Sequence, residues 1–131
     1  MLSKEEYLRF WIHQAESDWE VVEALFTIKK NSQSLFWGHL VLEKLCKAIW
    51  IRDNNENIPP KSHNLIYLLS QTTIKLDDEQ KEFFLTTNRF QIEGRYPEYI
   101  NEIETICNDE FTKTNLEKIN FYRKWLQEIL Q

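Results

Sequence analysis

The chain has few of the residues that make turns. Two glycines and three prolines occur in 131 residues, which leaves few places for the tight turns that join many short strands. No apolar run approaches the ~20 residues that a membrane-spanning helix needs. The N-terminus also lacks the charged-then-apolar order of a signal peptide. We therefore expect one all-α domain over residues 1–131, with a cytoplasmic location and no contact with a membrane.

Patterns typical of disulfides and metal sites are also missing. Cys46 and Cys107 stand singly among apolar residues, without a Cys-x-x-Cys motif, and no two of the three histidines have ligand spacing. We expect both cysteines to be reduced packing residues, and we expect neither a metal nor a cofactor. The net charge of −5 argues against broad binding to nucleic-acid phosphates, which normally needs a basic face. Any contact with nucleic acid should therefore be local.

The apolar residues that are present follow a helical period. Ser3 and Glu6 have the spacing of a capping box, and apolar residues recur every three or four positions as far as about Thr27. Charged and turn-forming residues divide the rest of the chain. Further helices are predicted over 34–52, 64–71 and 77–94, and 99–111 reads either as a loop or as a short helix.

The last predicted helix begins at a second capping box, formed by Thr114 and Glu117. Its apolar arc covers more than half of the circumference, because Phe121 and Trp125 widen it. One small bundle does not bury so wide an arc, so we expect a second subunit to cover part of this aromatic surface.

The helix predicted over 34–52 is apolar around most of its circumference, which is typical of the centre of a bundle or of a subunit contact. His39, Glu43 and Lys47 are each four residues apart, so they stack into a narrow polar stripe on this helix. Two interpretations of the stripe stay open. It is either a solvated edge or the wall of a polar site.

Other polar residues are also candidates for a site. His63 opens the short helix, where a histidine either bonds a neighbouring group or carries a proton near neutral pH. Asn88 and Arg95 are seven residues apart and would share one side of the helix predicted over 77–94. Arg95 beside Tyr96 either offers donors and a stacking ring to a phosphate or ties the helix end to an acidic neighbour.

The order of these motifs resembles the HEPN domain (higher eukaryotes and prokaryotes nucleotide-binding), in its prokaryotic branch with Arg-Tyr-Pro. After an apolar first helix come Glu43-Lys44-x-x-Lys47-Ala48, Pro60-x-x-His63-Asn64-Leu65 and Arg95-Tyr96-Pro97. The resemblance covers nearly the whole chain. It implies an up-and-down four-helix bundle with an additional short helix, usually as a homodimer. Prokaryotic members often pair with a nucleotidyltransferase as toxin and antitoxin, so the resemblance also implies such a partner.

The nuclease branch of that family carries Arg-x(4–6)-His and cleaves RNA without a metal. Here no histidine follows Arg89 or Arg95 at that spacing, so whether the chain is an enzyme stays open. The resemblance implies a cleft that binds a nucleotide or RNA. The alternatives are a metal-independent ribonuclease toxin with a degenerate motif and a non-catalytic interaction module. The ligand-binding candidates are Arg95, Tyr96, Asn88, His63, Lys47 and Glu43.

Overall fold

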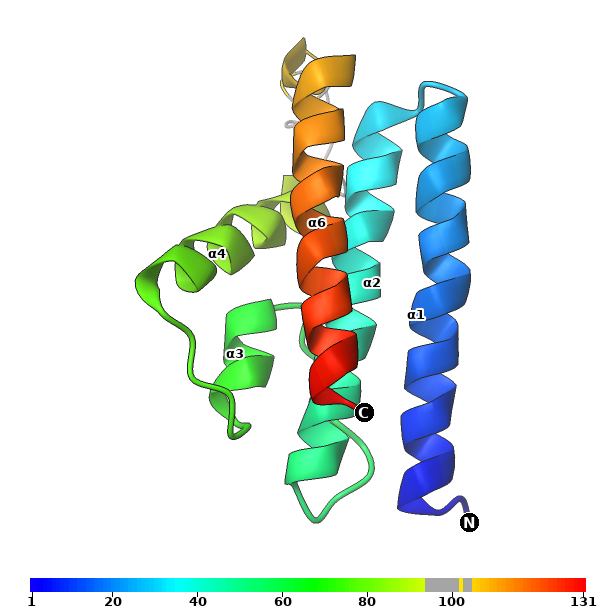
Figure 1. The fold of residues 1–131 in the computed structure, drawn as a ribbon, viewed down its shortest axis with the longest axis vertical. Coiled ribbons are helices and arrows are strands. Elements are labelled where there is room, and N and C mark those ends of the chain that lie inside the picture. Colours follow the sequence, from blue (N-terminus) through cyan, green and yellow to red (C-terminus); the bar gives the residue numbers. More distant parts are fainter. Residues whose placement is uncertain (94–101, 103–104) are drawn as a thin grey trace.

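The computed structural model describes residues 1–93, 102 and 105–131, and every regular element in that part of the chain is a helix. Three long helices, α1 (Lys4–Thr27), α2 (Asn31–Asp53) and α6 (Asp109–Ile129), stand side by side in Figure 1. The short α3 (Leu65–Ser70) and α4 (Asp78–Glu93) lie on one side of them. The predicted all-α bundle is confirmed. None of the described helices is long and apolar enough to cross a membrane.

The first helix begins as the sequence predicts. The Ser3 hydroxyl accepts a hydrogen bond from the backbone N–H of Glu6, and the Glu6 carboxylate accepts one from the backbone of Ser3. The predicted capping box is therefore confirmed. In the turn after α1, Lys29 adopts a positive φ of 64°. α2 then begins at Asn31, three residues before the predicted start at 34.

α2 is the central helix of the molecule, as its apolar circumference predicts. It packs against α1, α3, α4 and α6. Leu42, Leu45 and Ile49 on this helix are fully buried, and burying each such side chain contributes about 1.5–3 kcal/mol. A Cβ on Gly38 would lie 3.0 Å from Cδ1 of Ile119 on α6, so the absent side chain makes room for that helix.

The last helix starts earlier than the sequence predicts. α6 begins at Asp109, because the Asn108 side chain accepts a hydrogen bond from the backbone N–H of Phe111 at 2.8 Å. The predicted capping box at Thr114 and Glu117 is wrong, since both residues lie inside the helix. Asparagine is as good an N-cap as threonine, and the acidic first turn of α6 suits the positive end of the helix dipole.

The two cysteines are buried in the core and form no disulfide, as predicted. Cys46 is fully buried, and that burial raises the pKa of its thiol far above the usual range. Because the thiolate is the reactive form of cysteine, Cys46 is a packing residue and not a nucleophile.

Candidate functional site

The polar stripe of α2 faces the interior of the protein. His39 is 0% exposed, Glu43 is 4% exposed and Lys47 is 9% exposed. The interpretation of the stripe as a solvated edge is therefore wrong. Burying three ionisable side chains on one helix face costs free energy unless they pair with one another or with neighbouring elements.

Glu43 is at the centre of this arrangement. Its Oε2 accepts a hydrogen bond from Lys47 Nζ at 3.1 Å, and its Oε1 lies 2.8 Å from Nδ1 of His63 in the segment before α3. His39 Nδ1 lies 3.9 Å from the same Oε1. We call His39, Glu43, Lys47 and His63 the Glu43 cluster. It joins one face of α2 to the start of the next helix.

The pairing with Glu43 fixes the orientation of the His63 ring. A carboxylate only accepts hydrogen bonds, so Nδ1 of His63 carries a hydrogen and donates it to Glu43. The neutral ring then has its acceptor lone pair on Nε2. Because the His63 side chain is 46% exposed, a ligand can reach it from solvent. A histidine held in this way by a carboxylate is oriented for ligand binding or for proton transfer.

Lys47 is enclosed by α1 as well as by its partner on α2. Its Nζ lies 5.4 Å from the ring centroid of Trp11, within the range of a cation–π interaction. Trp11 belongs to the apolar stripe of α1, and helical spacing alone does not distinguish it from an ordinary core residue. The sequence reasoning therefore missed its contact with the cluster.

Asn88 reaches the site through Asn64, the N-cap of α3. The Asn64 Oδ1 accepts hydrogen bonds from the backbone N–H groups of Ile66 and Tyr67, and the Nδ2 of Asn88 donates to the same oxygen at 3.0 Å. The Asn88 Oδ1 in turn accepts from the backbone N–H of Leu65 at 3.0 Å. These bonds hold α4 beside the segment that carries His63. The sequence reasoning missed Asn64, although an asparagine directly before an apolar helical run is a recognised capping signal.

His39 lies fully buried behind this surface. Neither ring nitrogen has a hydrogen-bond partner of ordinary geometry among the described residues. Burial lowers the pKa of His39 from 6.5 to about 4, although the nearby Glu43 carboxylate, the Asn88 side chain and the His63 backbone each favour its charged form. His39 is therefore neutral at pH 7, and it adds no charge to the cluster.

The described residues thus bring together Glu43, Lys47 and His63 directly, and Asn88 through Asn64. Arg95 and Tyr96 lie outside the described residues, and their place in the site stays a prediction. Over residues 1–93, 102 and 105–131, no group of three or more histidine, cysteine and acidic side chains has an arrangement that could hold a metal ion.

Comparison with known proteins connects this geometry to a family. The model of the HEPN domain matches residues 8–129, a range that runs from the first turns of α1 to the end of α6. The matched range includes every residue of the Glu43 cluster. Comparisons with curated proteins and with solved structures gave no match.

Proposed function

Because the chain belongs to the HEPN-domain family, we propose that it binds a nucleotide or an RNA segment where the Glu43 cluster meets Asn64 and Asn88. One observation carries this proposal. The buried Glu43 carboxylate holds Nδ1 of His63 at 2.8 Å, while the His63 side chain stays 46% exposed. An exposed histidine with a fixed ring and a lone pair on Nε2 is a specific polar contact for a ligand.

The chemistry of the site suits a ligand with few phosphates. The protein has a net charge of −5, and the positive charge of Lys47 is matched by Glu43. Recognition would therefore use a hydrogen bond that Nε2 of His63 accepts and hydrogen bonds that the amides of Asn64 and Asn88 donate. Arg95 and Tyr96 would add a fork of donors for one phosphate and a ring on which a base can stack.

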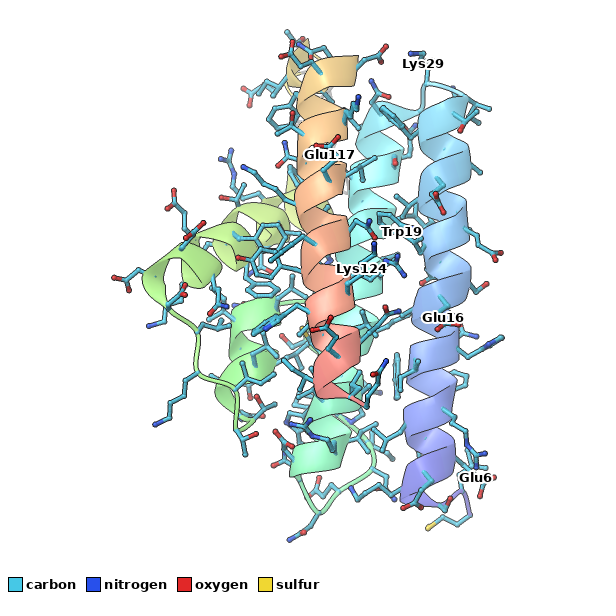
Figure 2. All side chains as sticks on the ribbon, viewed as in Figure 1. Glu6, Glu16, Trp19, Lys29, Glu117 and Lys124 are labelled. Atoms are coloured by element: carbon cyan, nitrogen blue, oxygen red, sulfur yellow. The ribbon has the colours of Figure 1, made fainter. Side chains whose placement is uncertain are left out.

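We also propose that the protein works as a homodimer beside a nucleotidyltransferase partner, in a toxin–antitoxin-like pair. A groove of about 310 Å³ between α1 and α6 supports a homodimer. Trp19 lies in this groove, between the two helices in Figure 2. Trp19 and Phe26 line this groove and are only partly buried, so a second copy that packs here would cover apolar surface. The nucleotidyltransferase follows from the family resemblance alone.

Fluorescence anisotropy with a labelled single-stranded RNA, and with ATP as competitor, tests the binding proposal. We expect His63→Ala to weaken RNA binding by about tenfold, equivalent to ~1.4 kcal/mol, because it removes a direct contact. The matched control is His13→Ala, since His13 is an exposed histidine on α1. Equal affinities for the wild type and His63→Ala would contradict the proposal.

The hydrogen bond between Glu43 and His63 also favours a second candidate, metal-independent cleavage of RNA. In that reaction Nε2 of His63 would take the proton of a ribose 2′-hydroxyl. The hydroxyl oxygen would attack phosphorus, and the 5′-oxygen would leave with a proton from solvent water. Incubation with RNA in the presence of a chelator tests it. Cleavage that is lost in a folded His63→Ala variant would support an enzyme. The absence of both RNA binding and RNA cleavage in the wild type would support an interaction module.

A further inference from the structure

A cleft between α4 and α6 plays no part in the proposed function. Its volume is about 430 Å³, and it is lined by Glu79, Glu82 and Phe83 of α4 and by Lys118, Phe121 and Tyr122 of α6, among others. We call it the α4–α6 cleft. It lies within the range of about 300–1,000 Å³ that is usual for ligand pockets.

Aromatic rings form the walls of the α4–α6 cleft. Phe83 stacks on Tyr122 with ring centroids 4.1 Å apart and planes 20° apart. Phe121 meets Tyr122 at 5.2 Å and 84°, so two ring planes form a corner. Phe121 is 66% exposed, so much of its ring is open to a ligand. Faces of aromatic rings carry partial negative charge and attract cations.

The charged residues of the cleft add to this preference. Glu79 and Glu82 oppose one positive charge, that of Lys118. Burial, and then the negative charges of Glu79 and Asp77, raise the pKa of Tyr122 above its usual range. Two carboxylates beside the exposed Phe121 ring therefore favour a positively charged occupant and disfavour a nucleic acid.

We propose that the α4–α6 cleft binds an arginine or lysine side chain from a basic segment of a partner protein. The exposed Phe121 ring would contact the cation, and Glu79 and Glu82 would pair with its charge. A second copy of this chain, expected from the sequence to cover the surface that Phe121 and Trp125 widen, fits this cleft less well. A two-fold contact would bring the acidic rims of both copies together, and like charges across an interface cost free energy.

Nuclear magnetic resonance titration of the isotope-labelled protein with a short glycine–arginine peptide tests this proposal. We expect saturable shifts confined to α4 and α6. Phe121→Ala and Glu82→Gln should each weaken binding by about threefold, because an exposed cation–π contact or ion pair contributes about that much. Lys118→Gln should strengthen binding by a similar factor, because it removes the opposing charge.

Two control variants and two other ligands distinguish binding in the α4–α6 cleft from non-specific attraction of a basic peptide to an acidic protein. Phe10→Ala and Glu20→Gln, at exposed positions on α1, should leave binding unchanged, and a glycine–glutamate peptide should not bind. Equal losses in the control variants, or no saturable binding, would overturn the proposal. A labelled RNA that shifts the same resonances would overturn it as well. So would a Phe121→Ala variant that changes from dimer to monomer in sedimentation, because a second copy would then occupy the cleft.

Discussion

Single residues on one face of α2 show where this protein departs from an ordinary helical core. A buried ion pair is weak support for stability, because apolar residues of similar volume often do as well or better. Glu43 and Lys47 are nevertheless buried together, and an exposed histidine is bonded to the same carboxylate. We propose that this arrangement serves to position His63 more than to stabilise the fold.

Removing the carboxylate of Glu43 should destabilise the fold. Glu43→Gln leaves the Lys47 charge buried without its partner, and we expect the free energy of unfolding to fall by about 3 kcal/mol. Urea denaturation measures this change. Glu56→Gln, at an exposed position, is the control. The double variant Glu43→Gln with Lys47→Met should regain part of the lost stability, because it also removes the buried charge. If Glu43→Gln alone were as stable as the wild type, Glu43 and Lys47 would not form a buried ion pair.

His39 should make stability depend on pH. Burial lowers its pKa to about 4 in the folded state, whereas the unfolded chain has the ordinary value of 6.5. Between these values the unfolded state binds the proton and the folded state does not, so stability is full above pH 6.5 and falls as pH drops toward 4. The loss should be on the order of 3 kcal/mol.

Urea denaturation across this pH window, in the wild type and in His39→Gln, measures the effect. The variant should lose less stability than the wild type as pH falls, whatever its stability at pH 7. His13→Gln is the matched control and should keep the slope of the wild type, because His13 is exposed. Parallel curves for the wild type and His39→Gln would show that His39 is not responsible.

The start or the position of a helix could be predicted from the sequence where a single capping or apolar pattern is present. The capping box of α1 has no competitor nearby, and the apolar circumference of α2 indicated its central place. At α6 two capping signals lie close together, at Asn108 and at Thr114, and spacing alone does not rank them. Likewise, the period of α2 predicted which residues share a face. It does not say that α3 and α4 cover that face.

Two substitutions should distinguish the two capping signals of α6. Asn108→Ala removes the acceptor of the Phe111 backbone N–H, and we expect a loss of about 1 kcal/mol in the free energy of unfolding. Thr114→Ala changes an exposed position inside the helix and should alter stability by less than about 0.5 kcal/mol. Thermal or urea denaturation of both variants measures this difference. A larger loss of stability in Thr114→Ala than in Asn108→Ala would place the start of the helix at Thr114.

The whole molecule has a net charge of −5, so we expect any nucleic-acid site to be local. The family match and the helical arrangement agree, and both could be inferred from the order of motifs in the sequence. The site was only partly predictable. Glu43 and His63 are 20 residues apart and Asn64 and Asn88 are 24 apart, so their contacts depend on how the helices pack.

Binding of RNA should depend only weakly on salt. An acidic protein with a local site neutralises one or two phosphates, so the slope of log affinity against log salt should be about −1. Anisotropy titrations of the wild type at several salt concentrations measure this slope. A slope several times steeper would indicate an extended basic surface and would contradict a local site.

Nitrogen resonance spectroscopy of the histidine side chains during titration with RNA tests whether Glu43 holds His63 for a ligand. We predict that Nε2 of His63 shifts as RNA binds, that Nδ1 of His63 remains hydrogen-bonded to Glu43, and that the exposed His13 does not respond. RNA binding that leaves both His63 nitrogens unchanged would contradict the claim that Glu43 holds His63 for a ligand.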